Sequence, residues 1–284
     1  MSISKTLPQH EAWDLLGRTP DREIGLLDAA MLVARDEYPE LDTAHYEALW
    51  STHTDALRSR LTDAAGSEQR LMLLNRYLFD EQGFSGNHDA FYDPRNSYIN
   101  DVLDRRLGIP LSLALVQMEL ARRLEVPLEG ISFPGHFLVR LRVEGGLLVL
   151  DPYHRGRSVD VDELKQRASP HLGNIQVDDQ QLLQMLEPAS HRMIVMRMLR
   201  NLKGLYLEQE NWEKALRCAD RLVRVAPHNP DALRDRGALY HRLGHVDAAR
   251  PDLMRYLELA PDAEDSEQIR ELLVDASRMH TSLN

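Results

Sequence analysis

Apolar residues recur every three or four positions between residues 21 and 82. This spacing places them on one face of a helix, where they can be buried together. Two runs show it most clearly, namely Ile24, Leu27, Ala30, Met31 and Ala34, followed by Leu71, Leu74, Tyr77 and Leu78. The first part of the chain is therefore predicted to be helical.

The next segment is predicted to form a loop and two further helices. The stretch GFSGNHDAFYDPRN (83–96) is rich in turn-forming residues and aromatics, and we expect it at the rim of a site. SYINDVLDRRLG (97–108) predicts a helix with Gly108 as its C-terminal cap. Pro110 suits the first position of the next helix. That helix, continuing through LSLALVQMELARRL (111–124), is apolar nearly all round and is predicted to be the buried centre of the domain.

An alternation of period two predicts a β-hairpin after these helices. The first strand is expected at 136–143 and the second at 147–151, with Glu144-Gly145-Gly146 as the turn between them. Pro152 prevents the second strand from continuing. A small antiparallel sheet inside a mostly helical domain is the result.

The C-terminal third repeats with a period of 34 residues. Corresponding pairs are Leu199 and Leu233, Tyr206 and Tyr240, Ala215 and Ala249, and Pro227 and Pro261. This is the period of the tetratricopeptide repeat, in which each unit is a helical hairpin. Two repeats do not cover their own ends, so a capping helix is expected at 266–279. Its inward side chains are predicted to be Ile269, Leu272, Leu273 and Ala276.

Composition narrows the function classes. The formal charge of −11 argues against nucleic acid as the main partner, because phosphate backbones require a basic face. We find no signal-peptide pattern and no apolar run of about 20 residues, so a cytoplasmic protein without a membrane span is expected. The single cysteine, Cys218, excludes an internal disulfide framework. His241 and His245 stand four residues apart with His228 nearby, but zinc requires a third or fourth ligand and Gly244 marks the helix end there. Neither a metal nor another cofactor is therefore expected.

Three residues stand in the order of a catalytic triad. Ser112 lies at a helix start, His136 at a strand start and Asp151 at a strand end. A helix N-terminus favours an ionised nucleophile, an imidazole accepts its proton and a carboxylate orients the imidazole. A two-residue turn at Gly145–Gly146, however, places Asp151 opposite Arg140, about 13 Å along the strand from His136.

Each member also has a structural interpretation. Ser112 is either a nucleophile or a hydroxyl that satisfies backbone groups at the helix start. His136 and Asp151 are either a general base with its orienting carboxylate or a hydrogen-bonded pair that stabilises the fold.

Four blocks, SYIN, RRLGIPLSLAL, FPGHFLVRL and LDPY, together with the two repeats, resemble the bacterial SirB-type family. The resemblance covers about residues 20 to 265. It implies an α+β fold, with a mostly helical transglutaminase-like (papain-type) domain over 1–188. An all-α tetratricopeptide region then follows over 189–284. The family name implies a role in regulating another gene and carries no assigned biochemical activity.

The chain departs from active transglutaminases at the nucleophile. Their cysteine stands in a Gly-x-Cys pattern at the helix start, where Gly108-Ile109-Pro110 supplies a proline. The resemblance therefore favours a protein-binding adaptor or regulator with a degenerate site. Its protein or peptide partner is expected on the concave face of the repeats or in the cleft at His136. Candidate contact residues are Tyr98, Asn100, Arg105 and Tyr153. The alternative is an acyl-transfer or amide-hydrolysing enzyme that uses Ser112, His136 and Asp151.

Overall fold

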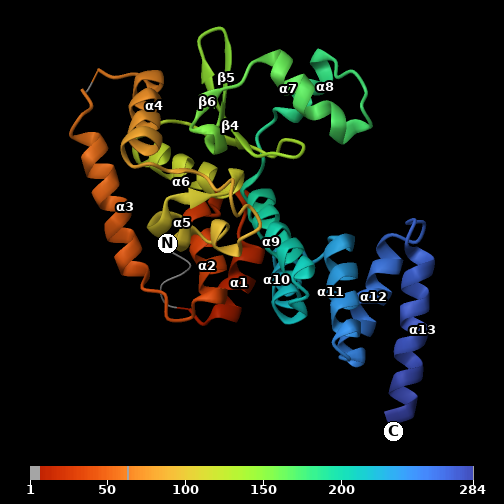
Figure 1. Cartoon of the computed structure of the whole chain (residues 1–284). Helices are drawn as coiled ribbons and strands as arrows, with labels where there is room; N and C mark the ends of the chain where they lie inside the picture. The colour runs from red at the N-terminus through yellow and green to blue at the C-terminus, as the bar shows by residue number, and fades with distance from the viewer. Residues whose placement is uncertain (1–6, 63, 284) are drawn as a thin grey trace. The chain divides into compact units, whose positions relative to one another are not determined.

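The computed structural model describes residues 7–62 and 64–283, and side chains through residue 274 (Figure 1). The fold is α+β, as predicted. Its chain forms two compact units: one holds residues 21–195, and the other holds 7–20 together with the chain from 196 onward. The sequence-based division left residues 7–20 with the first domain, whereas the structure groups them with the repeat helices.

The first unit is mostly helical. Its α-helices are α2 (Leu26–Glu37), α3 (Thr43–Arg58), α4 (Ser67–Asn75), α5 (Ile99–Arg105), α6 (Pro110–Arg123), α7 (Val161–Ala168) and α8 (Asp179–Met185). Shorter turns are η1 (Asp21–Glu23), η2 (Arg76–Glu81), η3 (Pro94–Asn96), η4 (Pro152–His154) and η5 (Ser169–Leu172). Its strands are β1 (Ser85–Gly86), β2 (Leu107–Gly108), β3 (Glu129–Ile131), β4 (Leu138–Val143), β5 (Gly146–Asp151) and β6 (Arg157–Ser158).

Helix α6 is the centre of this unit. Every residue from 111 to 121 is buried, and the helix contacts α2, α3, α4, α5 and the sheet. Pro110 begins it, as predicted. The prediction that Gly108 caps the preceding helix is wrong. Helix α5 is instead closed by Arg106 in the left-handed region (φ 58°), and Gly108 pairs with Gly86 in the small parallel sheet.

The hairpin register differs from the sequence-based expectation. Val143 pairs with Gly146, so the turn residues are Glu144 and Gly145, and Gly145 takes a positive φ of 87°. A glycine with positive φ at the third position is typical of a type II turn. Val139 then pairs with Leu150. This register moves the end of β5 two residues closer to His136 than predicted, and no bulge is needed.

Both faces of the four-stranded sheet β3-β4-β5-β6 are covered. On one face, Ile131, Leu138 and Val149 join a core with residues of α7 and α8. On the other, β4 packs against α6 (Figure 1). At Gly130 of β3, an added Cβ would lie 2.8 Å from the Phe137 ring and 3.2 Å from Met118 of α6. This close approach brings the segment before β4 against the central helix.

The second unit contains the predicted helical hairpins. Its helices are α1 (Gln9–Arg18), α9 (His191–Glu208), α10 (Trp212–Val225), α11 (Pro230–Arg242), α12 (Val246–Leu259) and α13 (Ser266–Leu283), with α9 beginning in the first unit. Helix α13 packs on α11 and α12 and buries Ile269. Leu272 and Leu273 are half-buried, while the Ala276 side chain lies outside the described residues.

Helix α1 covers α10 at the other end of the repeats. Gly17 lets the two backbones approach, because an added Cβ would lie 2.2 Å from the Arg224 carbonyl oxygen. Asp14 accepts a hydrogen bond from Arg224 Nη1 at 2.6 Å, and Arg221 lies over the Trp13 ring. The two repeats therefore have a helix at each end, which supplies the cover that a short array requires.

The two repeats differ where the second one has glycines. Gly237 packs tightly on Leu253, whereas Lys203 at the same repeat position forms an ion pair with Asp235. Gly244 takes a positive φ of 78°, and its counterpart Glu210 takes 55°. Glu210 thus adopts a conformation that glycine accepts without strain and that a Cβ opposes.

We expect Glu210→Gly to raise the free energy of unfolding by about 0.5–1 kcal/mol. Relief of Cβ strain of roughly 1–2 kcal/mol is partly offset by the greater freedom of glycine in the unfolded chain. Glu208→Gly, at the exposed end of α9, is the matched control and should lower stability by up to about 1 kcal/mol. Urea denaturation followed by circular dichroism measures both, and equal effects of the two changes would contradict the strain argument.

Candidate functional site

The carboxylate of Asp151, at the end of β5, is completely buried and bonded on all sides. His136 Nε2 lies 2.9 Å from Oδ1, and His154 Nδ1 lies 2.7 Å from Oδ2. Arg167 Nη1 donates to Oδ2 at 2.7 Å. We refer to Asp151, His136, His154 and Arg167 as the Asp151 cluster.

Local chain geometry places each member of the cluster. Asp151 is the N-cap of η4, and its Oδ1 accepts the backbone N–H groups of Tyr153 and His154 at 3.1 and 3.3 Å. His136 follows a tight turn in which Gly135 takes a φ of 66°. Arg167 belongs to α7 and also donates to Glu163 Oε1 at 2.6 Å. The cluster therefore joins the end of β5, the turn before β4 and helix α7.

Electrostatics keep the Asp151 carboxylate ionised. Burial alone would raise its pKa, but the hydrogen bonds that His136, Arg167 and His154 donate, together with the electrostatic interaction with His136, outweigh that effect. The net result is a pKa well below the usual range for aspartate. Because a carboxylate only accepts hydrogen bonds, His136 Nε2 and His154 Nδ1 each carry a hydrogen toward it. A neutral His136 then has its basic lone pair on Nδ1.

Aromatic residues surround the two imidazoles. The rings of His136 and His154 are stacked at 6.0 Å, and the Tyr153 ring meets His136 edge-on at 6.1 Å. His88 and Phe91, both from the 83–96 loop, lie 4.7 and 6.0 Å from the Tyr153 ring. This loop does border the Asp151 cluster.

The structure gives Ser112 a set of backbone partners. Its Oγ donates to the Asn96 carbonyl at 2.6 Å and accepts the Ile109 N–H at 3.1 Å. The residue is 2% exposed, and among the described residues its hydroxyl makes no hydrogen bond to His136. Pro110 occupies the first helical position, where the resemblance to transglutaminases predicts the cysteine of an active enzyme. His136 and Asp151 are thus brought together, and Ser112 is bonded elsewhere.

The four predicted contact residues differ in their exposure. Tyr98 and Asn100 are 3% and 4% exposed, so in this structure neither presents its side chain to a partner. Arg105 is partly exposed and lies 3.6 Å from Asp93, with its Nη1 3.4 Å from Asn96 Oδ1. Tyr153 is the one that borders the Asp151 cluster, and its hydroxyl donates to the Asn87 carbonyl at 3.4 Å.

Two members of the cluster were missed by the sequence analysis. His154 follows Asp151 by three residues in the LDPYH segment, and an Asp-Pro turn starting there would have brought the two side chains together. Arg167 gave no comparable signal, because its partner lies 16 residues away on another element.

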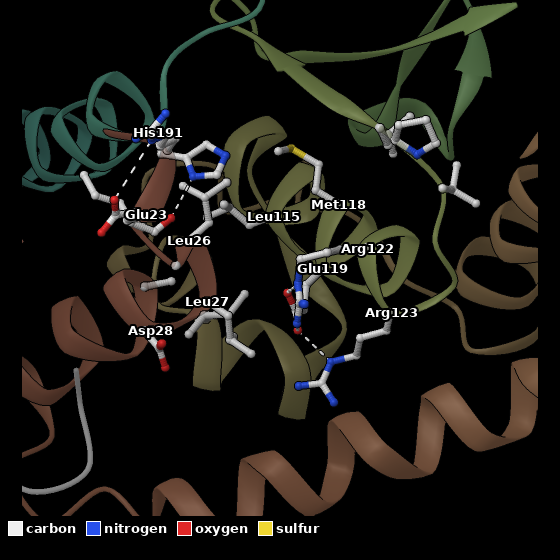
Figure 2. A pocket seen from close by; sticks show the side chains of 18 of the residues that line it. Glu23, Leu26, Leu27, Asp28, Leu115, Met118, Glu119, Arg122, Arg123 and His191 are labelled. Carbon is white, nitrogen blue, oxygen red and sulfur yellow. Dashed lines mark hydrogen bonds and ion pairs between the residues drawn. The ribbon is translucent and has the colours of Figure 1, made fainter. Parts of the chain in front are cut away.

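A separate cavity of about 670 Å³ lies between α2 and α6 in the first unit (Figure 2). Leu26 and Leu27 of α2 face Leu115 and Met118 of α6 across it. Charged residues also line the cavity. Among them, Glu119 accepts hydrogen bonds from Arg122 and Arg123, one turn further along the same helix. His191 borders it and bonds the Ile24 carbonyl through Nδ1 at 2.7 Å. No residue of the Asp151 cluster lines this cavity, and the sequence analysis did not predict it.

Comparison with known proteins agrees with both parts of the fold. Residues 44–200 match the transglutaminase-like superfamily, and residues 202–274 match the tetratricopeptide repeat. A UPF0162 protein of Xylella fastidiosa (strain 9a5c) is 49% identical over 265 residues, which is 93% of this chain and 94% of the relative. A UPF0162 protein of Pseudomonas aeruginosa is 34% identical over 263 residues, 93% of each chain.

Protein SirB1 of Salmonella typhimurium is also similar, at 26% identity over 214 residues, 75% of this chain and 78% of the relative. These matches confirm the resemblance to the SirB-type family found in the sequence. Within the described part of the chain, no helix offers the apolar length that a membrane crossing requires.

We expect Asp151→Asn to lower the free energy of unfolding by about 1.5–3 kcal/mol at pH 7, because the amide cannot accept all the hydrogen bonds that His136, His154 and Arg167 donate to the buried carboxylate. The depressed pKa of Asp151 stabilises the folded state at pH values above about 4, which is the pKa of an aspartate in the unfolded chain. This stabilisation is lost as the pH falls below that value. The difference in the free energy of unfolding between wild type and Asp151→Asn should therefore become smaller below about pH 4. Urea denaturation between pH 3 and 7 measures it.

Asp80→Asn is the matched control for this change. Asp80 also pairs with an arginine, Arg155, at 2.8 Å, but both side chains are exposed. Its removal should cost less than about 1 kcal/mol. Similar losses for the two variants at pH 7 would show that the Asp151 cluster does not anchor the fold.

Proposed function

Because the chain belongs to the transglutaminase-like superfamily and to the UPF0162 proteins, we propose that it is a protein-binding adaptor with a degenerate acyl-transfer site. Its repeat unit would hold a protein or peptide, and the effect on gene expression implied by the family would be indirect. The proposed location is the cytoplasm, since a single buried cysteine suits a compartment that maintains free thiols.

The bonding of the Ser112 hydroxyl is the observation that carries this proposal. A serine nucleophile needs its proton directed at a base, within about 2.6–3.2 Å. Here the proton is donated to the Asn96 carbonyl, and the oxygen also accepts the Ile109 N–H. Gly108 adds to the confinement, because a Cβ there would lie 2.7 Å from Oγ. The hydroxyl therefore supports the junction between η3 and α6.

The first unit contains no cysteine that could replace the serine. The one cysteine of the chain, Cys218, belongs to α10 of the repeat unit and is 5% exposed. Pro110 stands where the resemblance places the cysteine of active transglutaminases, and its side chain has no nucleophilic atom. Retention of His136 and Asp151 is then explained by their structural bonds, because the cluster joins three segments of the first unit.

The repeat unit supports the binding part of the proposal. Tetratricopeptide repeats generally mediate protein–protein interaction through extended concave surfaces. Arg200 on α9 and Arg242 on α11 are both exposed, and a peptide with carboxylate groups suits these guanidinium groups.

The catalytic alternative is tested directly with a fluorophosphonate probe on the full chain. We expect no labelling of Ser112, because its hydroxyl faces a carbonyl and lacks a base. Ser112→Ala should lower stability by about 1 kcal/mol, since it removes the hydroxyl's 2.6 Å bond to the Asn96 carbonyl while the Ile109 N–H still donates to that carbonyl at 3.3 Å. Labelling of Ser112 by the probe, abolished by His136→Ala, would overturn the proposal in favour of the hydrolase.

The binding surface is tested by lysine cross-linking of the full chain in bacterial extract. The chain has lysines only at 5, 165, 203 and 214. Cross-links to one partner should form at Lys214 in the repeat unit, and not at Lys165 in the first unit. Arg200→Glu should weaken capture of that partner about tenfold, whereas Arg142→Glu, an equal charge change at an exposed position of β4, should leave it unchanged. Cross-links confined to Lys165, or equal effects of the two variants, would contradict binding by the repeats.

A further inference from the structure

We propose that His136, Asp151 and His154 form a binding site for a divalent transition-metal ion, with Zn²⁺ as the simplest occupant. This differs from the sequence-based expectation of no metal, because the sequence separates His136 from the other two residues by a whole hairpin. The site goes beyond the adaptor function and does not depend on it.

The ligand atoms already converge. One nitrogen from each imidazole and an oxygen of Asp151 all lie within 4.8 Å of one another. Zinc bonds of about 2.0–2.1 Å in a tetrahedron place neighbouring ligand atoms roughly 3.3 Å apart. The two hydrogen-bond separations, 2.9 Å from Oδ1 to His136 Nε2 and 2.7 Å from Oδ2 to His154 Nδ1, are shorter than this and involve different oxygens of Asp151. Binding of an ion therefore requires the rings to move apart.

The type of each ligand selects the class of metal. Two imidazole nitrogens and one carboxylate suit Zn²⁺, Cu²⁺, Ni²⁺ or Fe²⁺, whereas Mg²⁺ and Ca²⁺ prefer oxygen alone. Each ring now donates a hydrogen to Asp151. On binding, each neutral imidazole transfers that hydrogen to its other nitrogen, and the freed lone pair bonds the metal. In each ring one N–H bond breaks and another forms on the other nitrogen, so the proton stays on the imidazole.

A metal ion can reach this site from solvent, and the Asp151 ligand is already held in place. The His154 side chain is 42% exposed, so an ion can enter from solvent, and water can complete the coordination. Asp151 itself is completely buried and is held by the N–H groups of Tyr153 and His154. Such bonds to a ligating carboxylate fix its orientation before the metal arrives.

Arg167 is expected to lower the affinity of this site for a metal ion. Its guanidinium shares Oδ2 of Asp151 with His154 and places a positive charge beside the incoming ion. Glu163 offsets part of that charge through its bond to the same arginine at 2.6 Å. Removing the arginine charge should therefore tighten metal binding, which a site elsewhere in the chain would not show.

Calorimetric titration of the EDTA-treated full chain with ZnCl₂ tests the proposal. We expect one site that loses at least about tenfold in affinity in both His136→Ala and His154→Ala, and gains about threefold to tenfold in Arg167→Gln. His88→Ala is the matched control, since its exposed ring lies 6.1 Å from that of His154 outside the ligand set, and should change nothing. Unchanged affinity in His154→Ala, or in Arg167→Gln, would overturn the assignment.

A second measurement needs no variant. Copper(II) titrated into the EDTA-treated wild-type chain should give an electron paramagnetic resonance spectrum with splitting from two imidazole nitrogens. Zinc should remove this signal when added in excess. A spectrum with one nitrogen or none would exclude the site even if a histidine variant failed to fold.

Discussion

The buried carboxylate of Asp151 is the constraint on which the first unit depends. Removing an ionised group from water is expensive, and several kcal/mol must be recovered from partners. Hydrogen bonds from two imidazoles, a guanidinium and two backbone N–H groups offset this desolvation cost for the Asp151 carboxylate. These partners come from three segments, the turn before β4, the turn η4 and helix α7, so the arrangement of these segments follows from one charge.

The central helix depends on a second polar contact of the same kind. Ser112 joins the N-terminus of α6 to η3 through the Asn96 carbonyl. With Gly108 packed on its hydroxyl, the start of α6 is fixed by backbone bonds. In an active site the same position would hold a reactive group facing a cleft. Here it faces the chain itself, and Pro110 removes both a thiol and an N–H from the helix start.

The sequence predicted the elements with strong periodicity. The repeats, their spacing of 34 residues and the continuous burial of α6 all follow from apolar patterns that local physics imposes. The hairpin register did not follow, because Glu144-Gly145-Gly146 permits two turns that differ by two residues in pairing. The structure uses the turn that needs only one positive φ, at Gly145.

The parts that the sequence did not predict depend on contacts between distant segments. Helix α1 has an ordinary amphipathic pattern, and only its contact with Arg224 and Arg221 shows that it belongs with the repeats. Arg167 is likewise an ordinary helix residue until α7 is placed beside Asp151. These long-range contacts depend on how the whole unit packs, so a local sequence pattern does not predict them.

A His–Asp pair is therefore weak support for catalysis in this fold. Once a carboxylate is buried, its partners are retained because their loss would leave an unpaired charge in the interior. The nucleophile has no such structural role and can be lost first. What then remains is a rigid group of nitrogen and oxygen atoms whose bonding hydrogens are exchangeable. That chemistry is as suited to holding a metal ion as to moving a proton, and the second imidazole, His154, favours the metal.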